Sequence, residues 1–122
     1  MHGIPPGFNW KAPDYTPVYA DRIARLQRLR DDPSLIPGVK AYYADDRPVE
    51  FITDWCQTFD PRAAERNLPT MMPFLLFEKQ GEFIDWLLAR WRGREDGLTE
   101  KSRDMGVSYL CVAFSVWMWL FK

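Results

Sequence analysis

Apolar residues recur at helical spacing in four stretches of this chain, and prolines or glycines separate the stretches. Residues 1–15 contain prolines and little periodicity, which predicts an irregular arm. A first helix is predicted from Thr16-Pro17, because a hydroxyl followed by a proline favours a helix start. Its arginines are expected on a solvated face, with contact to phosphates as the alternative. The apolar side of this helix comprises Val18, Ile23, Leu26 and Leu29.

Two more amphipathic helices are predicted in the middle of the chain. Residues 31–46 are expected to be short and broken at Pro37-Gly38, after which Asp46 can cap a helix that reaches Phe59. A charged loop with further prolines follows up to Pro73. The apolar run 74–77 is followed by Glu78-Lys79-Gln80-Gly81 and then by the next helix, which extends to about Arg92. Its predicted buried stripe consists of Phe83, Ile84, Leu87, Leu88 and Trp91.

The closing segment, residues 107–121, is apolar around its whole circumference apart from Ser108 and Ser115. Such helices lie inside a protein or inside a membrane. The segment is shorter than the ~20 residues that span a bilayer, so we predict a buried helix and no membrane association. Residues 97–102 are the stretch best placed to be a strand that precedes this helix, on position more than composition.

Composition describes one small domain, since 122 residues lie within the usual size of a single core. The 17 acidic residues nearly balance the 16 basic ones, which argues against a uniformly basic surface that binds nucleic acid nonspecifically. Cys56 and Cys111 lie far apart without metal-ligand spacing, which favours a reducing, cytoplasm-like compartment. Six tryptophans predict large apolar faces that must be buried.

The turn before the last helix carries the candidate chemistry. Gly106 allows the backbone to approach an anion, and amides at a helix start favour negative charge. Ser108 stands where phosphate-binding loops place the hydroxyl ligand of a nucleotide-bound Mg²⁺. The usual pattern would require glycine at 101 and lysine at 107, but this chain has Lys101 and Val107. Lys101 and Arg103 can still supply the cations; the alternative is a basic turn that caps a core helix.

Five motifs follow one another between residues 59 and 108: Phe59-Asp60-Pro61-Arg62, Leu68-Pro69, residues 72–80, residues 83–87 and residues 100–108. In their order and spacing they resemble the N-terminal part of the large terminase subunit of tailed phages. The resemblance covers roughly residues 40–120. In that family the large subunit is an ATP-driven motor that packages DNA into a procapsid, with a nuclease domain further along the chain.

The resemblance implies roles for individual residues. Gln80 matches the adenine-reading glutamine, and a carboxamide can donate to and accept from adenine at once. Phe77 or Phe74 would stack on the base. Lys101 would bind the β- and γ-phosphates of ATP, Arg103 would act on the γ-phosphate as the catalytic arginine, and Ser108 would ligate Mg²⁺. The remaining cofactor-binding positions of the loop are Ser102, Asp104, Met105, Gly106 and Val107.

The expected fold is mostly α with a minor β part. A helical N-terminal region, residues 16–73, would lead into the first strand, P-loop and helix of an α/β P-loop NTPase domain, residues 74–122, which ends before the acidic metal-binding motif and the nuclease. We therefore expect nucleotide binding without turnover and self-association through the apolar helix. The resemblance also implies double-stranded DNA, the portal and the small terminase subunit as partners of the full-length motor, in the host cytoplasm.

A second hypothesis is a small helical adaptor that docks on another protein through its aromatic faces. The turn before the last helix would then only cap that helix. Nucleotide affinity separates the two hypotheses, because an adaptor should not depend on Gln80, Lys101 or Arg103.

Overall fold

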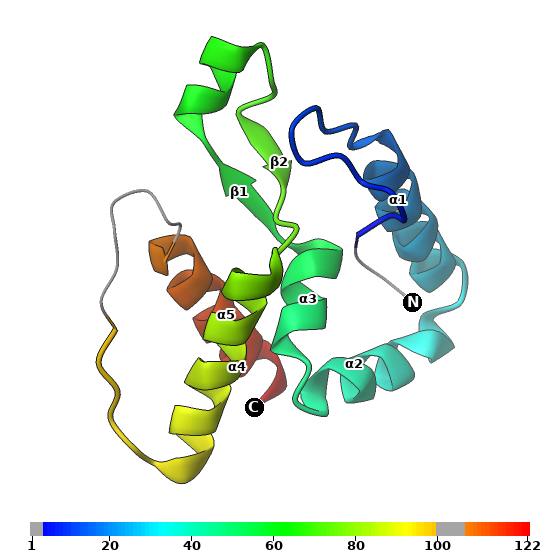
Figure 1. The fold of residues 1–122 in the computed structure, drawn as a ribbon. Coiled ribbons are helices and arrows are strands. Elements are labelled where there is room, and N and C mark those ends of the chain that lie inside the picture. The colour runs from blue at the N-terminus through cyan, green and yellow to red at the C-terminus, as the bar shows by residue number, and fades with distance from the viewer. Residues whose placement is uncertain (1–3, 100–106) are drawn as a thin grey trace.

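Three helices, α3 (Pro48–Trp55), α4 (Glu78–Gly93) and α5 (Val107–Phe121), lie against one another at the centre of the structure (Figure 1). The computed structural model of the protein describes residues 4–99 and 107–122. These residues are mostly helical with one small antiparallel sheet, which confirms the expected mostly α fold with a minor β part.

Ion pairs at the ends of the helices fix their directions. Asp46, which precedes α3, pairs with Arg92 at the end of α4. The Nζ of Lys122, which follows α5, lies 3.0 Å from Oδ1 of the same aspartate. Helices α4 and α5 therefore run parallel to each other and antiparallel to α3. Asp46 does not cap α3 as expected: its φ is 53°, and Arg47 occupies the capping position without a side-chain hydrogen bond.

The hydrophobic core lies between these three helices and α2 (Ile36–Ala44). Trp117 of α5 is fully buried, and its indole Nε1 donates a 2.9 Å hydrogen bond to the carbonyl oxygen of Tyr43 in α2. The predicted stripe of α4 faces this core through Ile84 and Leu88, with Trp91 left exposed at its end. The buried members of the core are Tyr43, Phe51, Ile52, Phe74, Leu76, Ile84, Leu88, Leu110, Ala113, Phe114 and Trp117.

Helix α2 replaces the short, broken segment expected for residues 31–46. A 3₁₀ turn, η1 (Pro33–Leu35), leads directly into it. Pro37 falls in the first turn of α2, where its missing N–H removes no helical hydrogen bond. The proline therefore starts a helix here and does not break one.

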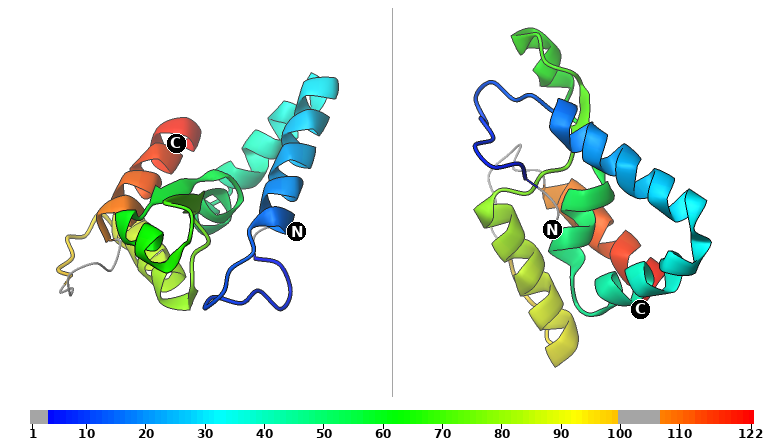
Figure 2. Two further views of the ribbon diagram at one scale, coloured as in Figure 1. Left: turned by 90° about the horizontal axis from the view of Figure 1, so that it is seen from above. Right: turned by 90° about the vertical axis from the view of Figure 1, so that its right-hand side faces the viewer.

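Helix α1 (Thr16–Asp31) packs on a different face from the one its apolar residues predicted. Val18 and Arg22 are its buried residues, whereas the side chain of Ile23 is 67% exposed. The side of α1 that faces α3 includes Arg22 and Arg25, because their guanidinium groups bind backbone carbonyls at the end of α3. The hydrogen-bond acceptors on α3 therefore influence which face of α1 is buried more than the hydropathy of its side chains does. In Figure 2, α1 lies on the far side of α3 from α4.

The sheet is a hairpin of β1 (Gln57–Phe59) and β2 (Met71–Pro73), paired with Thr58 opposite Met72. Both strands lie where a helix end and a loop were expected. The predicted helix ends at Trp55 because Cys56 is extended, and the carbonyl of Cys56 accepts a hydrogen bond from the amide of Phe74. A 3₁₀ helix, η2 (Pro61–Arg66), fills most of the connection between the strands.

Helix α5 is buried on one face only, whereas sequence predicted a helix covered on all sides. Leu110, Ala113 and Phe114 face the core with Trp117. The opposite face leaves apolar side chains in solvent, because no described element covers it, and the side chain of Trp119 is 83% exposed. Among the described helices, none combines the length and hydropathy needed to cross a membrane.

Candidate functional site

The predicted nucleotide-binding residues fall into two groups. Phe77, Gln80, Val107 and Ser108 belong to the part of the chain that the structure describes. The other group lies outside the described residues, and so does the second half of the predicted strand 97–102. Residues 97–99 are described and are not in a strand. This second group comprises Lys101, Ser102, Arg103, Asp104, Met105 and Gly106.

The first turn of α4 holds the predicted adenine-binding residues. Phe77 occupies the capping position of α4 in an extended conformation. The Oε1 of Gln80 accepts a 3.3 Å hydrogen bond from the backbone N–H of Phe77, which holds the carboxamide at the start of the helix. One lone pair of Oε1 remains for a second donor. Sequence placed Gln80 just before a helix, whereas α4 already begins at Glu78 and includes Gln80 in its first turn.

An aromatic side chain from the N-terminal arm lies beside Phe77. The ring centroids of Trp10 and Phe77 are 6.4 Å apart with their planes nearly perpendicular. Phe8 contacts Trp10 edge-on at 5.0 Å and also lies 5.8 Å from Tyr15. Trp10 and Phe77 both remain exposed, so this end of α4 presents an aromatic surface to solvent. Nothing in the sequence linked the arm to this position.

The start of α5 lies near the segment that leads into α4. Tyr109, in the first turn of α5, contacts Phe74 with ring centroids 6.4 Å apart. Phe74 lies three residues before Phe77, so the first turns of α4 and α5 are held at one end of the helix pair. Val107 is half-buried and Ser108 is exposed at this end.

The chain returns along α4 after that helix ends. Arg94 adopts a left-handed conformation, and the carboxylate of Glu95 pairs with Arg90 at 2.6 Å. Gly97 lies against the indole of Trp86, where a Cβ atom would come within 2.5 Å of the ring. Since Trp86 lies closer to the start of α4 than Arg90, the segment runs back toward the end of the helix pair where α5 begins.

Two arginines of α1 bind the end of α3. The Nη2 of Arg22 donates to the carbonyl of Thr53 at 2.8 Å, and the Nη2 of Arg25 donates to the carbonyl of Asp54 at 2.6 Å. Guanidinium groups stabilise the unpaired carbonyls and the negative end of a helix dipole. Burial lowers the pKa of Arg22 from its usual value. The expectation of a solvated arginine face is therefore wrong for these two residues.

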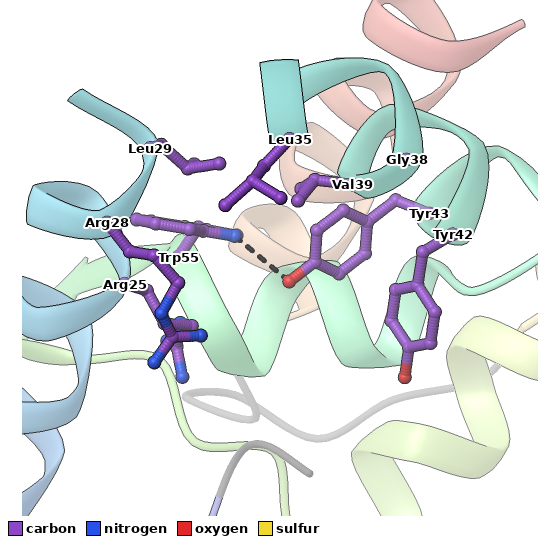
Figure 3. A pocket seen from close by; sticks show the side chains of 9 residues that line it. All are labelled: Arg25, Arg28, Leu29, Leu35, Gly38, Val39, Tyr42, Tyr43 and Trp55. Atoms are coloured by element: carbon purple, nitrogen blue, oxygen red, sulfur yellow. Dashed lines mark hydrogen bonds between the residues drawn. The ribbon is translucent and has the colours of Figure 1, made fainter. Parts of the chain in front are cut away.

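An open cavity of about 390 Å³ lies between α1, α2 and α3 (Figure 3). Leu29, Leu35, Val39 and the rings of Tyr43 and Trp55 give it apolar walls, while Arg25 and Arg28 line it from α1. Sequence reasoning missed this cavity, because its lining comes from three helices whose packing no local pattern specifies.

A buried hydrogen-bond network forms the floor of this cavity. Trp55 Nε1 donates to the hydroxyl of Tyr43 at 3.0 Å, and that hydroxyl donates to Oδ2 of Asp54 at 2.7 Å. Burial and the neighbouring carboxylate of Asp54 raise the pKa of Tyr43 well above its usual value. The tyrosine therefore stays neutral and keeps its hydroxyl as a donor, which fixes the relative positions of α2 and α3.

Potential metal ligands are not clustered within residues 4–99 and 107–122. No group of three or more His, Cys, Asp or Glu side chains there is arranged to hold a metal ion. Asp46, which is partly buried, pairs with the cations of Arg92 and Lys122, and this is a structural role. A magnesium ion at Ser108 would therefore take its remaining ligands from a nucleotide, from water or from other parts of the chain.

Comparison with known proteins identifies no relative: no family model, no curated protein and no solved structure matches this chain. Function must therefore be argued from the residues and their geometry. Two places in the described structure offer chemistry, namely the adjoining first turns of α4 and α5 and the cavity between α1, α2 and α3.

Proposed function

We propose that this chain is the ATP-binding N-terminal portion of a phage terminase large subunit, the motor that packages viral DNA. The contact between Phe74 and Tyr109 is the observation that carries the proposal. This contact holds the start of α5 beside the segment that leads to Phe77 and Gln80. A phosphate-binding turn would bind its anion at the start of α5. Base and phosphate of one nucleotide need neighbouring sites, and the contact brings the two first turns to the same end of the helix pair.

The side chains at the start of α4 fit an adenine base. Gln80 has a free lone pair on Oε1 for the exocyclic amine, and its Nε2 can donate to a ring nitrogen. Phe77 and Trp10 offer exposed rings on which a base could stack. These residues supply donors, acceptors and apolar surface, and no charge, which suits a neutral heterocycle.

The start of α5 fits the phosphates and their metal. The exposed hydroxyl of Ser108 would ligate Mg²⁺, which neutralises phosphate charge when bound. The amides of the first turn of α5 would face the phosphates, with Lys101 as the main cation and Arg103 acting on the γ-phosphate. Double-stranded DNA, the portal and the small terminase subunit are the proposed partners of the full-length motor in the host cytoplasm.

Titration with a fluorescent ATP analogue in the presence of Mg²⁺ tests this function. Lys101→Ala and Gln80→Ala should each weaken binding about tenfold or more, and Gln80→Ala should also reduce the preference for ATP over GTP. Lys79→Ala is the matched control, because Lys79 is an exposed neighbour of Gln80 that pairs only with Glu82 among the described residues. No ATP binding by the wild-type chain, or equal binding by all three variants, would reject the proposal.

A second function is favoured by the uncovered face of α5. Val112, Val116 and Trp119 lie on one side of this helix and are exposed. Contiguous exposed apolar surface commonly marks a protein interaction site. A helical adaptor would use this face and would bind no nucleotide, so the same titration separates the two functions.

A further inference from the structure

We infer that the cavity between α1, α2 and α3 binds an acidic segment of a partner protein, with one large apolar side chain of that segment inserted as an anchor. The inference does not depend on nucleotide binding, because none of the lining residues belongs to the first turns of α4 or α5. It assigns a role to a part of the molecule that the proposed motor site leaves unused.

The walls of the cavity suit an apolar anchor. Leu29, Leu35 and Val39 face the rings of Tyr43 and Trp55 across a space of about 390 Å³. This volume lies at the lower end of the range for binding pockets, and it suits one bulky side chain better than an extended ligand. The hydrogen bond from Trp55 to Tyr43 satisfies the polar atoms of both rings. An apolar group bound there would therefore leave no buried donor without a partner.

The charges at the cavity select an acidic partner. Arg25 and Arg28 are the charged residues of the lining, and no acidic side chain lines it. Arg25 is held in place by its bond to the carbonyl of Asp54 and by its position over the Trp55 ring, 5.0 Å from the centroid. Arg28 is exposed and makes no ion pair with the described residues, so it remains available to a carboxylate.

The type of lining residue favours a protein over a small molecule. Tryptophan, tyrosine and arginine are the residues enriched at the energetic centres of protein interfaces, and Trp55, Tyr42 and Arg25 occur together here. Leu35, which lines the cavity, also exposes apolar surface to solvent. A peptide that continues past its anchor would cover this surface, whereas a small ligand would leave it in water.

Fluorescence anisotropy with a short labelled peptide tests the inference. The probe consists of glutamates around one central phenylalanine, and a second probe has alanine in place of the phenylalanine. Gly38→Leu should fill the cavity, because a Cβ at Gly38 meets nothing within 4 Å. Ala41→Leu adds the same bulk to an exposed position of α2 outside the cavity. We expect Gly38→Leu to weaken binding at least tenfold and Ala41→Leu to leave it within twofold.

Charge reversal provides a second matched pair. Arg28→Glu should weaken binding about tenfold or more, while Arg30→Glu, which makes the same change on an exposed residue of α1 outside the cavity, should have a much smaller effect. Circular dichroism tests whether each variant is folded. If Gly38→Leu does not fold, the comparison of Arg28→Glu with Arg30→Glu still tests the inference.

Four results would overturn the inference. The first is no measurable binding at millimolar peptide, and the second is equal binding of the alanine-substituted probe or equal binding by Gly38→Leu. The third is binding of phenylpropionate as tight as that of the peptide, which would indicate a small-molecule site. The fourth is stronger competition by a single-stranded oligonucleotide than by unlabelled peptide, which would indicate a nucleic-acid site.

Discussion

The indole of Trp117 donates its N–H to the carbonyl oxygen of Tyr43 at 2.9 Å and links α5 to α2 across the core. Trp117→Phe removes this donor but leaves the carbonyl of Tyr43 its 3.4 Å hydrogen bond from the amide of Arg47, so we expect a loss of about 0.5–1.5 kcal/mol in the free energy of unfolding. Trp119→Phe is the control on the same helix, where exposure predicts a change within about 0.5 kcal/mol. Urea denaturation measures both; equal effects would show that the bond contributes little.

Arg22 is expected to matter far more for stability than the exposed Arg30 of the same helix. Its buried guanidinium donates to the carbonyl of Thr53, and hydrogen bonds to charged groups contribute about 1.5–3 kcal/mol. Arg22→Ala should therefore destabilise by that order, whereas Arg30→Ala, which removes an exposed arginine, should change stability little. Thermal unfolding that shifts equally in both variants would contradict the proposed attachment of α1 to α3.

Two glycines should respond in opposite directions to alanine. A Cβ at Gly97 would come within 2.5 Å of the Trp86 ring, so Gly97→Ala should displace the returning segment and change tryptophan fluorescence. A Cβ at Gly38 meets nothing within 4 Å, and alanine in a helix interior is more favourable than glycine by about 0.5–1 kcal/mol. Gly38→Ala should therefore stabilise the protein; a Gly97→Ala variant at least as stable as wild type would argue against close packing on Trp86.

The two thiols should react at different rates. Burial raises the pKa of Cys56 to about 11, while Cys111 is exposed. Below the unfolded-state thiol pKa of about 8.5, Cys56 is protonated in both the folded and the unfolded chain. Between about pH 8.5 and 11 the unfolded chain loses this proton first, so the stability of the fold decreases as pH rises. At pH 8, Ellman's reagent should modify Cys111 at least tenfold faster than Cys56. The variants Cys56→Ser and Cys111→Ser assign the two phases, and equal rates would contradict burial of Cys56.

Self-association is expected through the uncovered face of α5. Val112→Glu combined with Trp119→Glu places charges on that face and should lower both the association seen by sedimentation and the binding of a hydrophobic dye. Ala20→Glu changes charge at an exposed position of α1 and serves as the control. A wild-type chain that sediments as a monomer without dye binding would exclude this contact.

Local patterns in the sequence predicted the parts of the fold that depend on one element. The stripe of α4 was correct at Ile84 and Leu88, because periodic apolar residues face a core wherever the helix packs. The hairpin was not predicted, since pairing of Thr58 with Met72 depends on contacts between distant residues. The predicted face of α1 was correct at Val18 and wrong at Ile23, because Arg22 finds its acceptor on another helix.

The candidate site shows the same division. The sequence predicted a helix close after Phe77 and Gln80, which is a local property, although α4 begins at Glu78, a few residues earlier than expected. The proximity of Trp10 to Phe77 and the cavity along Arg25 and Arg28 both arise from tertiary packing, and no residue spacing could have indicated them.

The hydrogen bonds from Arg22 and Arg25 of α1 to the end of α3 affect how the protein responds to temperature. Separation of α1 hydrates two guanidinium groups and two carbonyls along with a small apolar area around Val18. Hydration of polar groups lowers the heat capacity, whereas hydration of apolar groups raises it. Detachment of α1 should therefore increase the heat capacity less than opening of the core around Trp117 does. In calorimetry, α1 should detach in a shallow transition before the main one.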